Sequence, residues 1–121
     1  MKVQIDTQNE GLEVVLKDYQ AEAMKLLWNG GNGEGGLRSF SSREVWQKVN
    51  ESMKHKTISR ASIINFLNAM VDDGVLVYRE TTGKGGHRRI YSAGKTEQEF
   101  WVWLIDVVSS KLKEAAGLYH M

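Results

Sequence analysis

The residues best suited to binding chemistry lie between Thr57 and Asn65, in the run Thr-Ile-Ser-Arg-Ala-Ser-Ile-Ile-Asn. An arginine presents a planar fork of donors that fits a phosphate or a guanine edge, and an asparagine can pair with adenine through two hydrogen bonds. Serine hydroxyls can reach phosphate oxygens where a helix begins against a nucleic-acid backbone. Four residues are therefore the main candidates for nucleic-acid contact: Ser59, Arg60, Ser62 and Asn65.

A helix predicted over residues 59–73 positions these side chains. Ser59 is suited to an N-cap, and Gly74 follows the last apolar position, where a left-handed cap costs least. Between the caps, apolar residues recur at helical spacing: Ile63, Phe66, Leu67, Met70 and Val71. The other face is polar and slim, which would let the helix approach a groove. An ordinary amphipathic helix with a solvated face has the same pattern, and Ser59 could act as a cap alone.

Further cationic and polar side chains lie on both sides of this helix. Upstream, the candidates for phosphate contact are Arg43, Lys54, Lys56 and Thr57. Downstream, alternating residues predict strands over 75–80 and 88–93, joined by a glycine-rich connection over 81–87. The candidates in this hairpin are Lys84, His87, Arg88 and Arg89. Successive side chains of a strand point to opposite faces, so Arg88 and Arg89 cannot share one role. Solvated hairpin charges are the alternative interpretation.

The net charge of +1 conceals an uneven distribution along the chain. Residues 54–90 hold seven Lys or Arg against three Asp or Glu, a local charge of +4. Residues 1–53 hold six against eight, and residues 91–121 three against four. A basic centre between acidic flanks favours a small nucleic-acid-binding surface. Chance clustering on a solvated face would give the same counts.

Two more helices are predicted before the candidate segment. The first begins at Asp18 and ends near residue 29, and the second runs to about residue 53. Ser41 and Glu44 have the spacing of a capping box at the start of the second helix. Trp28 and Trp46 are expected in the core. Residues 30–36 contain a literal G-x-G-x-x-G, but a helix precedes it where a dinucleotide site needs a strand, so we interpret it as a linker loop.

The two ends of the chain are read separately. Residues 1–17 predict an extended arm or two short strands, residues 18–93 one domain, and residues 94–121 a C-terminal helix starting near residue 97. The apolar arc of this helix is wider than one core contact requires, which predicts dimerisation through Phe100, Trp101, Trp103, Leu104, Val107, Val108 and Leu112. The two tryptophans lie about 200° apart on the helix, so one of them should meet a partner chain.

The sequence lacks the residues that several classes of function require. The 121-residue chain has no cysteine, so disulfides and thiolate metal sites are excluded. The three histidines form no i, i+4 pair, and no nucleophile, base and acid set is present, so we expect no metal site, no cofactor and no enzymatic activity. The longest apolar run, residues 100–105, is too short for a bilayer, and no signal sequence opens the chain. A cytoplasmic protein without membrane contact is expected.

The ordered motifs resemble those of the penicillinase-repressor family of winged-helix transcription regulators, which includes copper-responsive repressors. The resemblance rests on residues 21–28, 42–45, 59–67 and 73–76 and on Tyr91 at the end of the hairpin, and it covers roughly residues 18–93. It implies an α+β winged helix-turn-helix, three helices plus a hairpin wing, with an additional C-terminal helix for dimerisation. It also implies a dimeric repressor of palindromic operators. The family's three-helix tail is reduced to one helix here, and its paired-cysteine tail is absent, so copper sensing does not carry over.

Together these observations predict a sequence-specific regulator of transcription that binds double-stranded DNA. It would be a homodimeric repressor that reads the major groove with helix 59–73. In the alternative, the same helix and hairpin form a winged-helix module that docks a protein and binds no DNA. A more distant alternative is a ligand sensor with an apolar pocket beneath the last helix. No residue pattern in the sequence identifies a small-molecule effector.

Overall fold

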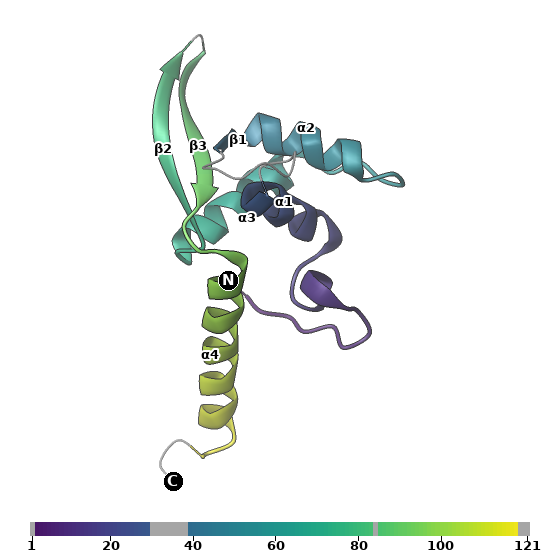
Figure 1. The fold of residues 1–121 in the computed structure, drawn as a ribbon, viewed down its shortest axis with the longest axis vertical. Coiled ribbons are helices and arrows are strands. Elements are labelled where there is room, and N and C mark those ends of the chain that lie inside the picture. Colours follow the sequence, from purple (N-terminus) through teal and green to yellow (C-terminus); the bar gives the residue numbers. More distant parts are fainter. Residues whose placement is uncertain (1, 30–38, 84, 119–121) are drawn as a thin grey trace.

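The protein is described by a computed structural model that covers residues 2–29, 39–83 and 85–118. These residues form four α-helices and a three-stranded antiparallel sheet, which confirms the predicted α+β class. Three helices pack together as a body. A long hairpin and the last helix leave the same side of this body and point in opposite directions (Figure 1).

The helical body consists of α1 (Asp18–Asn29), α2 (Ser42–Ser52) and α3 (Arg60–Asp72). The predicted capping box opens α2: the amide of Ser41 donates to the Glu44 carboxylate at 3.0 Å, and the amide of Glu44 donates to the Ser41 hydroxyl at 3.2 Å. Both hydrogen bonds satisfy backbone donors that have no partner inside the helix. The predicted starts and ends of these helices are confirmed within a residue or two.

The caps of α3 are those the sequence predicts. The Ser59 hydroxyl accepts from the amide of Ser62 at 3.1 Å, and Gly74 adopts a φ of +76° just after the helix. The apolar stripe of α3 forms the centre of the core, with four buried members: Ile63, Phe66, Leu67 and Met70. Val71 is half-buried at its edge. The opposite face of α3 is thereby turned away from the core.

The sheet contains β1 (Phe40–Ser41), β2 (Leu76–Gly83) and β3 (Gly86–Ala93), in the order β1-β3-β2. Strand β3 lies in the middle and pairs antiparallel with both neighbours. Its Tyr91 lies opposite Phe40 on one side and Tyr78 on the other. The base of the hairpin is therefore buried in the body, while the rest extends into solvent (Figure 1).

The hairpin is longer than predicted. Residues 81–87 were expected to be a connection, but β2 continues to Gly83 and β3 begins at Gly86, and these two glycines pair. Only two residues remain for the turn, and Gly85 has a φ of +105°. Strands pair through their backbones, so glycine-rich residues can also form a ladder. The sequence pattern therefore does not reveal the three further residue pairs between β2 and β3.

The N-terminal segment contains no strand between residues 2 and 17. A short 3₁₀ helix, η1 (Gly11–Val14), occupies the second of the two predicted strand positions. Leu12 and Leu16 are both buried, and the amide of Leu16 donates to the carbonyl of Leu12 at 2.9 Å. These leucines are four residues apart, so one helical turn buries both, whereas the alternation with Val14 suggested a strand.

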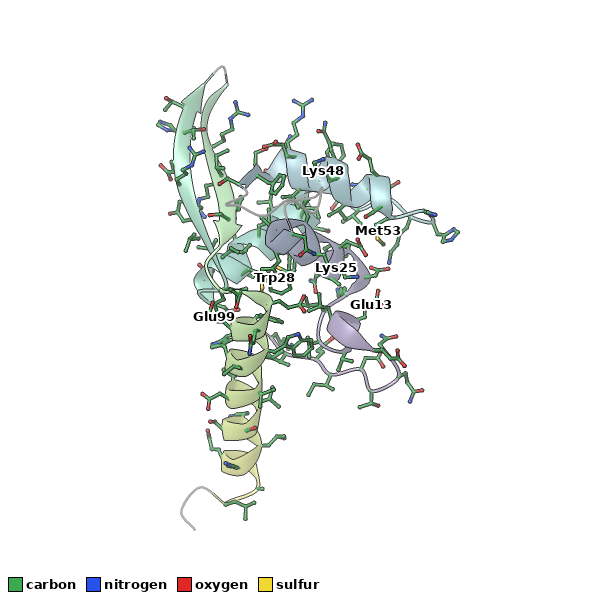
Figure 2. All side chains as sticks on the ribbon, viewed as in Figure 1. Glu13, Lys25, Trp28, Lys48, Met53 and Glu99 are labelled. Atoms are coloured by element: carbon green, nitrogen blue, oxygen red, sulfur yellow. The ribbon has the colours of Figure 1, made fainter. Side chains whose placement is uncertain are left out.

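The last helix, α4 (Glu97–Ala115), is joined to the body through one tryptophan. The Trp28 indole donates to the carbonyl of Lys95 at 2.9 Å, and its ring lies 5.5 Å from that of Phe100 (Figure 2). Trp28 is thus half-buried at the α1–α4 junction, where it serves as a hydrogen-bond donor as well as an apolar contact. Beyond its first turns α4 leaves the body (Figure 1).

Burial corrects two of the residues predicted to mediate dimerisation. Phe100 and Leu104 are 0% and 2% exposed, because they pack into the protein's own core, so they cannot contact a partner chain. Trp101 and Trp103 are both half-buried, and their rings lie 5.9 and 6.1 Å from the ring of Phe100.

Replacing Gly74 by alanine should lower the free energy of unfolding by about 1–2 kcal/mol, because a Cβ is strained at positive φ. The added atom would meet only the Lys95 ammonium, at 4.0 Å, so the cost is conformational and not steric. Urea denaturation measures it. Asparagine tolerates this conformation better, so Gly74→Asn should be milder. Equal losses in both variants would contradict this explanation.

Candidate nucleic-acid interface

The start of α3 is fixed by the peptide groups of one buried residue, Ile58. Its amide donates to the Asn50 side-chain oxygen at 2.7 Å, and its carbonyl accepts from the Asn50 amide at 3.2 Å and the Trp46 indole at 2.8 Å. Asn50 also donates to the carbonyl of Trp46 at 2.8 Å. Two side chains of α2 therefore determine where the turn ends and α3 begins.

The polar face of α3 is exposed. Arg60 and Asn65 are both exposed, and neither side chain has a hydrogen bond or ion pair to another described residue. Ser59 and Ser62 are engaged with each other, since the Ser59 hydroxyl donates to that of Ser62 at 2.9 Å. Arg60 and Asn65 thus keep their full donor capacity for a ligand, whereas the serines serve first as the cap.

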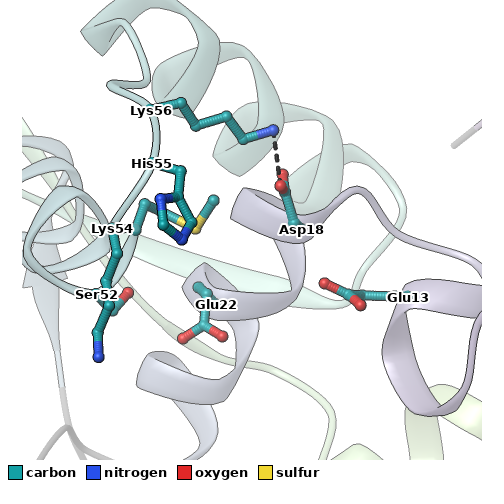
Figure 3. A pocket seen from close by; sticks show the side chains of 8 residues that line it. Glu13, Asp18, Glu22, Ser52, Lys54, His55 and Lys56 are labelled. Atoms are coloured by element: carbon teal, nitrogen blue, oxygen red, sulfur yellow. Dashed lines mark ion pairs between the residues drawn. The ribbon is translucent and has the colours of Figure 1, made fainter.

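The turn before α3 carries Lys54, His55, Lys56 and Thr57, all exposed. The Lys56 ammonium lies 2.6 Å from the Asp18 carboxylate of α1, across an open pocket of about 510 Å³ (Figure 3). The hydrogen bond from Lys56 is the main cause that holds the pKa of Asp18 below its usual value. Lys56 is therefore already paired with Asp18, whereas the sequence predicts a lysine that is free to contact phosphate.

Arg43 occupies an exposed position in the first turn of α2. The candidates from residues 43 to 65 therefore lie on the α2 N-terminus, on the α2–α3 turn and on α3 itself. Side chains of the N-terminal segment approach the same helix from one side. Lys2, Gln4 and Asp6 line an open groove of about 1340 Å³ together with Ser62 and Asn65.

The hairpin separates its two arginines as alternation predicts. Arg88 is exposed, whereas Arg89 turns inward, with its guanidinium 4.0 Å from the ring centre of Tyr78. Arg89 also donates to the side-chain oxygen of Asn68 on α3 at 3.1 Å. Arg89 therefore already has two partners within the protein, Tyr78 and Asn68. His87 is exposed beside Arg88, and Lys84 lies outside the described residues.

Asn50 and Asn68 were missed by sequence reasoning, although they connect the elements of the site. Asparagine is unfavourable within a helix because its side chain competes for backbone groups. An asparagine within a predicted helix is therefore the signal that could have found both. Their partners, the Ile58 peptide and the β3 side chains, depend on tertiary structure and leave no local pattern.

The described ranges carry neither a cluster of metal-ligating side chains nor a membrane-spanning helix. Residues 2–29, 39–83 and 85–118 contain no group of three His, Asp or Glu side chains that could hold a metal ion. Among the helices of these ranges, none combines the length and the apolar character needed to cross a membrane. The arrangement that remains is a set of donors and cations on α3, its preceding turn and the hairpin.

Comparison with known proteins gives no further assignment. No protein-family model matches the chain, and no curated protein matches it in sequence. The resemblance drawn from the motifs therefore stands on those residues alone.

Replacing Asn50 by alanine should lower the free energy of unfolding by about 1–3 kcal/mol, because the buried Ile58 amide loses its acceptor. Asn50→Asp keeps an acceptor for that amide but loses the donors, so its cost should fall between alanine and wild type. Chemical denaturation compares them, with the exposed Gln47→Ala of the same helix as control. A loss no larger than that of Gln47→Ala would show that the turn is held by other contacts.

Proposed function

We propose that this protein is a sequence-specific, double-stranded-DNA-binding regulator of transcription with a winged helix-turn-helix domain. In this proposal α2 and α3 form the helix-turn-helix, α3 enters the major groove, and the β2–β3 hairpin is the wing. The element order, the antiparallel sheet and the projecting hairpin are compatible with that fold. The finer assignment rests on the site residues.

The observation that carries the proposal is the exposed face of α3. This helix is buried along one stripe and held at its start by the Ile58 peptide contacts, yet Arg60 and Asn65 remain exposed and have no hydrogen bond or ion pair to another described residue. A helix held at its start and carrying exposed donors suits base-edge recognition, in which arginine fits guanine and asparagine fits adenine. Lys54, exposed in the turn before α3, would add a contact to phosphate.

The wing supplies a second, less selective contact. His87 and Arg88 are exposed near the end of the hairpin, next to the turn. Cations at a hairpin tip suit phosphate oxygens or the minor groove, which position a protein without reading much sequence. In this proposal α3 recognises the base sequence, and the hairpin raises the affinity for any duplex.

The last helix is proposed to join two copies. Ile105 and Leu112 are 62% and 64% exposed, and together with the half-buried Trp101 and Val108 they recur at alternating spacings of four and three. That repeat is the a/d seam of a coiled coil. It moves the predicted dimer contact away from Phe100 and Leu104. A stable dimer would need this seam and the contacts around it to bury about 800 Å² of surface on each partner.

Repression at a palindromic operator follows from two-fold symmetry and from the family resemblance. A symmetric dimer presents two copies of α3, which fits half-sites one turn of DNA apart. The resemblance to penicillinase repressors supports repression over activation.

Selection of bound duplexes from a random pool tests the proposal. We expect an inverted repeat, and a decrease of log affinity with log salt whose slope reports several phosphate contacts. No enrichment of any sequence, combined with flat and weak binding at low salt, would instead favour the protein-docking module. The selection also returns the half-site spacing, which the dimer must match.

Replacing Asn65 by alanine should weaken binding to the selected duplex by roughly 1–3 kcal/mol and relax the preference at one base pair. The side chain contacts no other described residue through a hydrogen bond, so thermal stability should hardly change. Fluorescence anisotropy measures the affinity, and Gln98→Ala on α4 is the matched control. Unchanged affinity would remove Asn65 from the contact surface.

Replacing Ile105 by glutamate should convert the dimer into a monomer, because it places a charge in the proposed seam. Sedimentation velocity at tens of micromolar measures the change, with Ser110→Glu on the other side of α4 as control. The monomer should bind a single half-site weakly. A wild-type protein that already sediments as a monomer, with or without DNA, would overturn the dimer.

A further inference from the structure

We propose that Asn68 is a positioning residue whose hydrogen bonds to β3 hold the hairpin in a fixed orientation to α3. Because these bonds use the side-chain oxygen of Asn68, its amide group has only N–H donors left for a ligand. The inference rests on the proposed function where it concerns DNA. Its structural part, the orientation of the hairpin, can be tested without DNA.

The side-chain oxygen of Asn68 receives two hydrogen bonds from β3. The Tyr91 hydroxyl donates at 2.7 Å, and the Arg89 guanidinium donates at 3.1 Å. A guanidinium has no acceptor, so the oxygen of the amide, and not its nitrogen, must face the hairpin. Two donors occupy both lone pairs of that oxygen, which fixes the orientation of the amide.

Both donors are themselves held in place. Tyr91 is 2% exposed, and burial raises the pKa of its hydroxyl, so the proton needed for donation stays on the oxygen at neutral pH. Arg89 is clamped from its other side by the Tyr78 ring, 4.0 Å from its guanidinium carbon. Tyr78 and Tyr91 are a cross-strand pair, so the contact spans both strands of the hairpin.

Other contacts hold the hairpin at its base. There β3 pairs with β1 at Tyr91 and Ile90, and the amide of Val75 donates to the carbonyl of Met70 at 2.9 Å. From Arg89 to the turn the two strands continue as a two-stranded ribbon, and such ribbons twist readily and are marginally stable alone. Asn68 adds an attachment from the middle of α3 that reaches Arg89, one residue beyond the β1–β3 pairs.

The occupied oxygen also limits what Asn68 could read. Pairing with adenine needs one acceptor and one donor from the same amide, and the acceptor of Asn68 is already used. Its amide nitrogen could donate only to acceptors such as guanine O6 and N7, thymine O4 or a phosphate. Asn65, three residues earlier, has both groups available. The two amides of α3 therefore differ in function.

The first experiment measures the hairpin in the free, full-length protein. The chain has no cysteine, so Thr82→Cys on the hairpin and Gln47→Cys on α2 allow two spin labels at chosen sites. Pulsed electron paramagnetic resonance gives the distance distribution between them. We expect a narrow distribution for wild-type Asn68, a broader and shifted one for Asn68→Leu, and a narrow one again for Asn68→Asp, which keeps the acceptor.

Asn65→Leu is the matched control, because it changes the same helix without a hydrogen bond to the hairpin. If Asn68→Leu does not fold, the double variant Asn68→Leu with Tyr91→Phe replaces it, since that variant leaves no buried hydroxyl without a partner. An unchanged distribution in Asn68→Leu, or in the double variant that replaces it, would overturn the proposal, as would an equal broadening in Asn65→Leu.

The second experiment measures the effect on DNA binding. In wild-type protein, Arg88→Ala should reduce the salt slope by about one unit, as loss of one phosphate contact does. In the Asn68→Leu protein the same change should reduce it much less, because the hairpin no longer holds its position. Equal reductions would overturn the link between Asn68 and the wing. If the wild-type protein binds no duplex, the proposed function fails, while the spin-label distances still decide the structural role of Asn68.

Discussion

A buried peptide group must have hydrogen-bond partners, and at Ile58 this requirement ties the turn before α3 to α2. Its amide and carbonyl are satisfied by Asn50 and Trp46, both from α2, so the turn can end in only one way. Loss of these partners would leave donors and acceptors unpaired in the core, at a cost comparable to a large part of a small domain's stability. The direction of α3 follows from that constraint.

Three asparagines show how one residue type takes different roles in neighbouring positions. Asn50 completes a turn, Asn68 connects a helix to a hairpin, and Asn65 has no internal partner among the described residues. The first uses both its oxygen and its nitrogen within the fold, the second uses its oxygen, and only the third keeps both groups available among the described residues. The pattern of internal hydrogen bonds therefore separates structural amides from the one we propose as a reader of bases.

The body of the protein supports two projecting elements with different surface chemistry. The hairpin ends in exposed polar and cationic side chains, including His87 and Arg88, whereas α4 carries exposed apolar side chains, including Ile105 and Leu112. They start beside each other on the body and point in opposite directions (Figure 1). Such a division suits a molecule that meets a polyanion at one end and a copy of itself at the other, as we propose.

The sequence by itself determined the helices, their caps and the central apolar stripe, because these depend on residues within a few positions of one another. Ser41, Ser59 and Gly74 were all identified in this way. Only the tertiary structure decided which exposed candidates stay free: Arg89 and Lys56 acquired partners from β2, α3 and α1. It also placed Phe100 in the core. These outcomes depend on contacts between residues far apart in the chain, and such contacts have no signature in local spacing.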